Sequence, residues 1–422
     1  MTYEQAIEYI ESKKAVETSL GLHRMRALMA ALGDPQRQYQ CVHVAGTNGK
    51  GSACAMAESI LRAAGYRTGL ATSPHLLRFN ERIRIGGVPV SDERLAQAAD
   101  MVRRIDEAMD EPAGWFEIIT AITLKIFALE GVEAAVLEVG LGGEFDATNV
   151  IDTPACALIM NIGLDHTAML GNTLGEIASA KAGIIKPGGD VVAYRGEPEV
   201  EAVFEKAAAG CGAVLHMAPF DSIVPRSESI DGQVFDAGGY KDLFLPLAGP
   251  HQQRNAAVVV SAMEILRARG WHISPEAVRR GLAGVEWPAR FEVVRRSPVC
   301  IVDGGHNPQC LDSAVEALQR LLPGRRVIFV TGILGDKDVP EMVDRLRAAG
   351  SEYITVTPRS ARAMEADELA AVIRAHGGQA ESGGDIAEGI ALALSRAGQD
   401  DVVCCIGSLY LAGEARQLLR GG

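Results

Sequence analysis

Short apolar runs that alternate with helical patterns are the feature that most limits how this chain can fold. The runs are rich in β-branched residues and apolar throughout, as in strands that are buried on both faces. Helix-like segments follow several of them, an order typical of parallel sheets covered by helices. We therefore predict an α/β fold with mostly parallel sheets. The strand candidates are QCVHVA (40–45), GLATS (69–73), AAVLEVG (134–140), ACALIMNIG (155–163), VCIVDGG (299–305), RVIFVTG (326–332), YITVTP (353–358) and VVCCIG (402–407).

The length of 422 residues exceeds one ordinary hydrophobic core and predicts two domains. Residues 190–250 are rich in Gly, Pro and Asp with weak periodicity, and we expect hairpins and loops there. The segment GVEWPARFEV (284–293) contains a proline and precedes a new β/α series, so the boundary is placed in it. The predicted domains are residues 1–287 and a smaller, Rossmann-like domain of residues 288–422, a size that folds alone.

Composition excludes several classes of partner. Apolar residues make up 48% and charged residues 23% of the chain, as in globular proteins. No apolar run is long enough to span a bilayer, and no signal peptide is recognisable, so we expect a cytoplasmic protein without a membrane partner. The net charge of −13 argues against a nucleic-acid surface, and any anionic substrate must be held by local positive groups.

The eight cysteines contain no C-x-x-C pair, and several stand in apolar, strand-like runs. We expect free, buried thiols and neither a disulfide framework nor a zinc site.

The segment GTNGKGS (46–52) follows the first strand candidate and precedes a helix predicted over 52–64, which ends at Gly65. It departs from the standard phosphate loop, because Gly46 stands too close to Gly49 and Gly51 separates Lys50 from the serine. A helix N-terminus at the carboxyl end of a strand still offers N–H groups and the helix dipole to an anion. The alternative, a tight turn with a solvated lysine, fits the three glycines less well. The segment therefore predicts a nucleotide site in a P-loop-type ATPase domain.

Spelled in this way, the loop resembles that of ATP-dependent amide ligases of the Mur ligase superfamily. Further motifs narrow the resemblance to folylpolyglutamate synthase and its bifunctional relative, dihydrofolate synthase. They follow one another in this order over nearly the whole chain: TSPHL (72–76), RFNERI (78–83), LEVGLGGEFDATN (137–149), LDHTAMLG (164–171), KAGIIKPG (181–188), DGGHNP (303–308) and GDKD (335–338).

The resemblance implies a three-substrate ligation. ATP phosphorylates the carboxylate of dihydropteroate or the terminal γ-carboxyl of a folate, and the amine of L-glutamate attacks the acyl phosphate. ADP and phosphate leave, and an amide remains. A carboxylate is a poor acyl donor, so phosphorylation supplies a leaving group, and the protein must mainly position reactants and neutralise charge. Polyglutamylation alone and the dual activity both fit the motifs.

One carboxylate interrupts a buried apolar strand. Glu138 lies near the strand's carboxyl end, where such a charge is costly unless it is paired or bound to a metal. The resemblance makes Glu138 and Ser73 ligands of Mg²⁺, and assigns His166 to a second ion. It also implies that Lys181, in a helix opened by a capping box at Thr173, is carbamylated and becomes an anionic metal partner. The non-functional alternatives are a salt bridge for Glu138 and an ordinary turn residue for Ser73. For His166 the alternative is a core or surface histidine, and for Lys181 a lysine that complements the helix dipole.

The resemblance also assigns nucleotide and catalytic residues. For Asn255, Arg290 and Asp303 it implies contacts with the adenine side, the phosphates and the ribose, against the alternatives of a helix asparagine and an ordinary ion pair. His306 and Asn307 belong to the same loop as Asp303, and Lys337 and Asp338 belong to a loop of less certain role. The predicted ATP-binding residues are Gly46, Thr47, Asn48, Gly49, Lys50, Gly51, Ser52, Asn255, Arg290 and Asp303. The predicted catalytic residues are Lys50, His166, Lys181 and His306.

The folate or pteroate end is assigned by resemblance to three stretches: Leu22, His23 and Arg24; Trp115, Phe116 and Glu117; and Phe145, Asp146 and Ala147. Trp115 and Phe116 could pack on a flat ring, and core packing is the alternative for Phe116. Glu144 stands where some relatives have arginine, and this places substrate details in doubt.

Two other functions remain as alternatives. The first is a Mur-type ligase acting on another carboxylate, such as a cell-wall precursor. The folate-type motifs and the apparent absence of an N-terminal nucleotide-sugar domain argue against it. The second is a regulatory P-loop ATPase without a ligase product, which the second domain and its DGGHNP loop disfavour. We expect a monomer whose partners are ATP, L-glutamate and the folate or pteroate.

Overall fold

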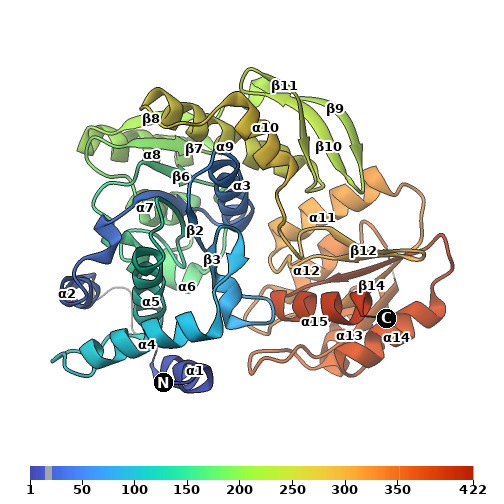
Figure 1. Ribbon diagram of the computed structural model, residues 1–422. Helices are drawn as coiled ribbons and strands as arrows, with labels where there is room; N and C mark the ends of the chain where they lie inside the picture. Colours follow the sequence, from blue (N-terminus) through green and yellow to red (C-terminus); the bar gives the residue numbers. More distant parts are fainter. Residues whose placement is uncertain (15–20, 351, 422) are drawn as a thin grey trace. The chain divides into compact units, whose positions relative to one another are not determined.

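The computed structural model describes residues 1–14, 21–350 and 352–421. The chain forms two compact units, and the part of unit 2 that follows residue 285 is coloured orange to red (Figure 1). Unit 1 comprises Met1–Val224, Asp236–Leu243 and Arg254–Val285, and unit 2 comprises Pro225–Phe235, Phe244–Gln253 and Glu286–Gly422. The chain therefore passes from one unit to the other more than once before unit 2 is complete.

Unit 1 is built on an eight-stranded sheet of order β4-β3-β2-β5-β1-β6-β7-β8. The six strands from β2 to β8 in this order pair in parallel, whereas β3 and β4 form an antiparallel edge, so the expected mostly parallel sheet is confirmed. The strands are β1 (Gln40–Ala45), β2 (Thr68–Ala71), β3 (Ile83–Ile85), β4 (Val88–Pro89), β5 (Ala134–Glu138), β6 (Cys156–Ile159), β7 (Asp190–Ala193) and β8 (Val214–Met217).

Helices of unit 1 bury the apolar side chains of this sheet. One core cluster joins β1 and β5 to α1, α2, α4 and α5, and another joins β6 and β7 to α7 and α8. Helix α3 contacts β1, β2 and β5 and packs against α10, where the Ser59 hydroxyl donates to the Gly281 carbonyl at 2.7 Å. The helices are α1 (Tyr3–Ser12), α2 (His23–Ala31), α3 (Lys50–Ala63), α4 (Asp92–Asp106), α5 (Trp115–Leu129), α6 (Thr167–Leu170), α7 (Leu174–Ala182), α8 (Pro198–Cys211), α9 (Pro250–Ala268) and α10 (Pro275–Ala283). The first turn of α9, residues 250–253, belongs to unit 2.

The expectation of hairpins and loops over residues 190–250 is wrong for its first part. Strand β7, helix α8 and strand β8 continue the parallel sheet there. The helix buries only a narrow apolar stripe, and β8 is a half-exposed edge strand, so neither has strong hydrophobic periodicity. The second part is confirmed as a three-stranded sheet of order β11-β10-β9, made of β9 (Val224–Ser229), β10 (Gly232–Ala237) and β11 (Tyr240–Leu245).

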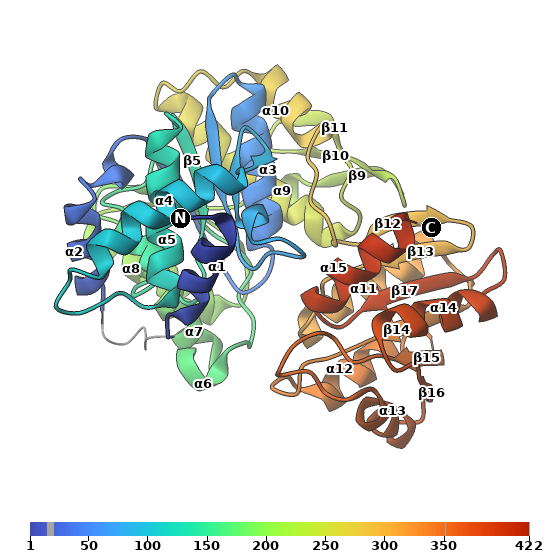
Figure 2. The same cartoon turned by 60° about the horizontal axis from the view of Figure 1, so that its bottom comes forward.

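Unit 2 contains a six-stranded sheet of order β12-β13-β17-β14-β15-β16, parallel except for β12 (Figure 2). Helices α11, α12 and α13 share one core cluster with the strands, while α14 and α15 contact β14, β15 and β17 separately from that cluster. The strands are β12 (Glu292–Arg296), β13 (Val299–Val302), β14 (Val327–Thr331), β15 (Glu352–Thr355), β16 (Gln379–Ser382) and β17 (Val402–Ile406). The helices are α11 (Pro308–Leu321), α12 (Val339–Leu346), α13 (Ala366–Ala375), α14 (Ile386–Arg396) and α15 (Leu409–Arg420).

The predictions about thiols and membranes can be compared with this fold. All eight cysteines are free, and six of them are buried, as expected. In the described part of the chain, no helix is both long and apolar enough to cross a membrane.

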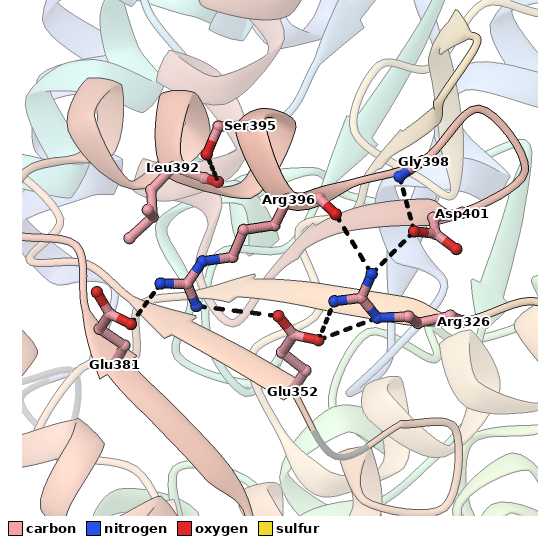
Figure 3. Close-up of polar contacts among 8 residues, drawn as sticks. All are labelled: Arg326, Glu352, Glu381, Leu392, Ser395, Arg396, Gly398 and Asp401. Carbon is pink, nitrogen blue, oxygen red and sulfur yellow. Dashed lines mark hydrogen bonds and ion pairs between the residues drawn. The ribbon is translucent and has the colours of Figure 1, made fainter.

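A network of ion pairs joins the amino ends of the unit 2 strands (Figure 3). Arg326, just before β14, donates to Glu352 at 2.6 Å and to Asp401 at 3.0 Å, and it also reaches the carbonyl of Arg396 at 3.3 Å. The Arg396 guanidinium in turn pairs with Glu381 and lies 3.9 Å from Glu352. One arginine thus links the starts of β14 and β15 to the segment before β17, at the end of the sheet opposite its carboxyl edge.

Arg326→Ala should lower the midpoint of thermal unfolding by about 2 °C or more, because three contacts are lost together. Arg362→Ala is the control, since Arg362 is exposed and makes one side-chain ion pair, with Asp336 at 2.8 Å. An isolated exposed pair contributes little, and we expect a shift below about 1 °C. Differential scanning fluorimetry measures both variants, and equal shifts would contradict a stabilising role of the network.

Candidate active site

The carboxyl ends of β1, β2, β5 and β6 meet at one edge of the unit 1 sheet. Val44 of β1 pairs in register with Glu138 of β5 on one side and with Leu158 of β6 on the other. The loops that follow these strands therefore start side by side. They carry the predicted P-loop, Ser73 and His166, and this edge is where ligands bind in open α/β sheets.

Two glycines of the P-loop lie where no larger residue fits. Gly46 has φ +146°, and a Cβ there would lie 2.7 Å from the Met160 side chain. Gly49 has φ +86°, and a Cβ would lie 2.6 Å from the amide oxygen of Asn255, in helix α9. Asn255 is buried, so the structure places this predicted residue directly against the loop.

The loop is tied to its neighbours and ends earlier than predicted. Thr47 donates its N–H to the Asn161 carbonyl at 2.8 Å, and its hydroxyl lies 3.1 Å from the Gly163 carbonyl. Helix α3 begins at Lys50, two residues before the predicted start. Lys50, Gly51 and Ser52 therefore lie in the first turn, the part of a helix whose N–H groups and dipole are suited to a phosphate.

Two lysines converge on one backbone carbonyl. The Lys50 ammonium donates to the carbonyls of Gly46 at 3.0 Å and Thr47 at 3.1 Å, and the Lys181 amine donates to the same Gly46 carbonyl at 2.8 Å. Burial, with a further contribution from Lys50, lowers the pKa of Lys181 to about 7, although Asp165 opposes the shift. Lys181 is thus the buried amine that can be neutral near pH 7. The capping box predicted at Thr173 is confirmed in its helix.

Glu138 and Ser73 lie together, as the metal prediction requires. The Glu138 carboxylate is buried and accepts the N–H of Ser73 at 2.9 Å. A buried carboxylate and a neighbouring serine, next to the strand that leads into the phosphate loop, can offer the hard oxygen donors that Mg²⁺ prefers, so these residue types fit that ion. Among the described residues, no group of three or more His, Cys, Asp and Glu side chains could hold a metal. Any Mg²⁺ here would therefore need ligands beyond carboxylates, such as substrate oxygens.

His166 follows β6 in a separate loop of the same sheet edge. It has φ +51° just before the short helix α6, and its side chain is 46% exposed. The ring lies 4.0 Å from the carboxylate of Asp165. The contact between Thr47 and Gly163 ties the loop of His166 to the P-loop.

A small cavity of about 30 Å³ lies beside Glu138 and Ser73, with Phe116 and Thr148 in its wall. The Phe116 ring lies against Gly140, where an added Cβ would overlap it. Phe116 is half-buried and packs on the core, as the core-packing alternative expects, and its contact with a folate or pteroate stays a prediction.

Arg82 also lines the cavity, and the sequence interpretation did not assign it. It is buried, its Nε donates to His75 Nδ1 at 2.9 Å, and its guanidinium lies 5.4 Å from the Trp115 ring and 5.5 Å from the Phe79 ring. Burial and the Arg82 charge lower the pKa of His75 to about 4. Arg82 stands in the motif RFNERI, which the sequence analysis used only as part of the resemblance. The motif was therefore a signal that could have pointed to this residue.

The residues predicted at the folate or pteroate end fall into three groups. Arg24 and Glu117 form a largely buried ion pair at 3.1 Å, and Glu117 also accepts the Gly114 N–H at 2.7 Å. The rings of Trp115 and Phe116 lie 6.2 Å apart. The remaining assigned residues are buried Leu22, Asp146 and Ala147, exposed Phe145, and His23, which bonds Glu111 at 2.7 Å.

Unit 2 carries its own cluster at the carboxyl end of β13. The Asp303 carboxylate accepts the N–H groups of Phe291 and Gly305, each at 2.7 Å. Burial raises the pKa of Asp303, and Arg290 opposes that shift. Ala289 has φ +56° and Phe291 φ +47°, so Arg290 lies between two left-handed residues, a conformation that costs about 1 kcal/mol or more at each.

The histidine and asparagine of this loop have separate tasks. His306 Nδ1 lies 2.9 Å from the Gly304 carbonyl, which can only accept, so this nitrogen carries the proton. Asn307 is buried and caps helix α11 by accepting the Cys310 N–H at 2.9 Å. Asp338 of the GDKD loop, next to Lys337, caps α12 in the same way. Within unit 2, Arg290, Asp303 and His306 therefore lie in one cluster.

Comparison with known proteins gives two family matches. The Mur ligase middle domain matches residues 44–263, and the Mur ligase glutamate ligase domain matches residues 289–409. The chain is 37% identical to folylpolyglutamate synthase of Lacticaseibacillus casei over the full length of both. It is 34% identical to dihydrofolate synthase/folylpolyglutamate synthase of Bacillus subtilis, covering 99% of each chain. Among solved structures, E. coli FolC in complex with DHPP and ADP matches with a TM-score of 0.89 and 30% identity, over 100% of this chain and 98% of that one.

Gly49→Ala should weaken ATP binding by about tenfold or more, because its Cβ would displace Asn255 from the loop and strain the backbone. Gly65→Ala is the matched control, since Gly65 has φ +97° but nothing lies within 4 Å of an added Cβ. The control has the same kind of backbone strain without the contact, so its ATP affinity should stay within about twofold. Calorimetric titration with a non-hydrolysable ATP analogue measures both, and equal losses would contradict the role of the Asn255 contact.

Proposed function

This chain belongs to the Mur ligase family, among the folylpolyglutamate and dihydrofolate synthases, and we propose that it is the ATP-dependent ligase that adds L-glutamate to a folate. The proposal includes dihydropteroate as a second acceptor, since the Bacillus subtilis relative bears both names and E. coli FolC was solved with DHPP and ADP. The reaction joins the γ-carboxyl of the folate, or the carboxyl of the pteroate, to the amine of glutamate. That the chain acts as a monomer in the cytoplasm stays a prediction.

The observation that carries the proposal is that Lys50 and Lys181 both bond the Gly46 carbonyl. Gly46 follows β1, and Glu138 lies on β5, the strand paired with it. A phosphate-binding loop alone would fit many ATPases. A second lysine, buried and bonded to the loop carbonyl at 2.8 Å, adds a group that a simple ATPase does not need. The family's two domain matches extend over both halves of the chain, as a ligase of this type requires.

The P-loop would hold the phosphates of ATP through the N–H groups of the first turn of α3. Lys50 lies over the loop and would follow the transferring phosphoryl group, moving from the carbonyls that it now contacts. Glu138 and Ser73 would hold Mg²⁺, which supplies charge neutralisation on the phosphates. Asn255 supports Gly49 from α9, and Arg290 and Asp303 remain proposed as further nucleotide contacts.

The acceptor carboxylate is proposed to lie beside Glu138 and Ser73, at the cavity bordered by Phe116. Trp115 and Phe116 offer flat apolar surface on this side, and the Arg82 guanidinium supplies positive charge. Because the cavity of about 30 Å³ has room only for a water-sized group, the pterin itself would lie outside it. The acyl phosphate would then form between the P-loop and this wall, where the surrounding side chains limit access of water.

The ligation itself is tested with purified protein, ATP, Mg²⁺, bicarbonate and glutamate, with either dihydropteroate or a reduced folate monoglutamate. We expect phosphate release and a gain of one glutamate residue in mass on both acceptors. Gain on the folate alone would restrict the enzyme to polyglutamylation. Phosphate release without a new amide on either acceptor would contradict the proposal and favour a ligase for another carboxylate or a regulatory ATPase.

We also propose a carbamate on Lys181. A carbamate forms only from the neutral amine, and a pKa of about 7, against an ordinary value of 10.5, leaves the amine largely neutral above pH 7 and protonated below it. Protein equilibrated with ¹³C-bicarbonate should therefore give a carbamate NMR signal that grows between about pH 6 and pH 8.

Lys181→Arg should remove that signal, since a guanidinium keeps the charge but forms no carbamate. Lys186→Arg is the matched control, because Lys186 is also partly buried and its pKa is also lowered by burial. A signal that persists in Lys181→Arg, or disappears in Lys186→Arg, would contradict the assignment.

A further inference from the structure

One histidine that no motif assigns lies at the centre of the unit 1 sheet. His43 is in β1, three residues before the P-loop, and its side chain is fully buried. Burial, with a contribution from the charge of Lys186, lowers its pKa to about 3. The imidazole is therefore neutral, and one of its two ring nitrogens carries a proton while the other accepts.

The hydrogen bonds decide which nitrogen carries the proton. His43 Nε2 lies 2.8 Å from the Thr148 hydroxyl, and that hydroxyl donates to the Asp146 carboxylate at 2.6 Å. A hydroxyl has one proton to donate, and the Thr148 hydroxyl donates it in the hydrogen bond to the Asp146 carboxylate. The Thr148 oxygen must then accept from His43, so the proton lies on Nε2. Nδ1 is left deprotonated, buried and without a hydrogen-bond partner among the described residues.

Asp146 and Thr148 in turn fix the start of the glycine-rich turn 140–149. Asp146 accepts the N–H groups of Leu141 at 2.8 Å and Thr148 at 3.0 Å. Thr148 lines the cavity that Glu138 and Phe116 share. The position of this cavity wall therefore depends on the His43–Thr148–Asp146 chain of hydrogen bonds.

The other end of the turn is fixed to the helix of Lys181. Asn149 donates to the Glu144 carbonyl at 2.8 Å and to the Gly183 carbonyl at 3.1 Å. A Cβ at Gly143 would lie 2.9 Å from the carbonyl of Lys181, so the turn packs directly on that helix end. The turn thus connects the cavity beside Glu138 to the segment that carries the buried lysine.

We infer that His43 is a positioning residue for the acceptor, acting through Thr148 and Asp146 on the wall of the cavity beside Glu138. The inference rests on the proposed function, since it assigns the acceptor to that cavity. A purely structural role explains the site less well, because an apolar side chain at this position would avoid a buried, unpaired nitrogen. The donor at Nε2 is the property that the site uses.

Four variants test the hydrogen-bond chain. His43→Leu removes the donor, and His43→Gln restores an N–H at a similar reach; Thr148→Val removes the hydroxyl, and Thr148→Ser keeps it. Michaelis constants for the acceptor and for ATP are measured separately for each variant, with the melting temperature as a check of folding. The double variant His43→Leu/Thr148→Val shows whether the two residues act together.

We expect His43→Leu to raise the KM for the acceptor about tenfold while the KM for ATP changes less than about twofold. His43→Gln and Thr148→Ser should recover most of the loss, and the double variant should be no worse than the poorer single variant. Equal changes in both Michaelis constants, additive losses in the double variant, or no recovery with glutamine would overturn the inference.

A spectroscopic measurement separates this inference from the proposed function. In ¹⁵N-histidine-labelled wild-type protein, the His43 signals should be those of the neutral tautomer protonated at Nε2, and Thr148→Val should change them. The opposite tautomer would overturn the hydrogen-bond chain whatever the enzyme's activity. If the wild type forms no glutamylated product, the proposed function fails; if it does and His43→Leu is unchanged, only the positioning role fails.

Discussion

The convergence of two lysine side chains on the Gly46 carbonyl is the interaction on which the site depends. Two ammonium groups at 3.0 and 2.8 Å from one oxygen repel each other, and burial removes the water that would screen them. Loss of a proton from Lys181 relieves this repulsion, and so would an anion at the P-loop. The parallel ends of β1, β5 and β6 create this situation, because they bring the two lysines and Glu138 to one edge of the sheet.

Much of the fold could be predicted because the central strands of its two large sheets, such as β5, β6, β13 and β17, are buried on both faces. All eight strand candidates, including GLATS and VVCCIG, overlap an observed strand, and the capping box at Thr173 marks the start of a helix. The prediction failed over β7, α8 and β8, where an exposed edge strand and a narrow apolar stripe leave little periodicity. Local sequence also placed the start of α3 two residues late, since the glycine and lysine at its first turn have no strong helix signal.

The motifs name candidate site residues, but they do not predict the contacts between them. The motifs pointed to Gly49, Asn255, Glu138 and Ser73, whereas their mutual positions depend on pairings far apart in the chain. Asn255 lies against Gly49 across 206 positions of sequence (255 − 49), a distance that no local pattern encodes. Arg82 and His43 were missed for the same reason. The aromatic ring and the cavity beside Arg82, and the hydroxyl bonded to His43, come from other segments of the chain.

The repeated passage of the chain between the two units has a consequence for how the protein can be divided. Unit 2 takes in residues 225–235 and 244–253 as well as everything after residue 285. Within unit 2, Glu228 pairs with Arg320 at 2.8 Å, and Gln233 donates to the carbonyls of Leu247 and Gly249. A single cut of the backbone near residue 287 would leave Glu228 and Arg320 on separate polypeptides, and Gln233 with its two partners would be separated from the rest of unit 2. Unit 2 is therefore compact in space but is made of three separate segments of the chain. Neither truncation of the gene nor limited proteolysis at one point would release it whole.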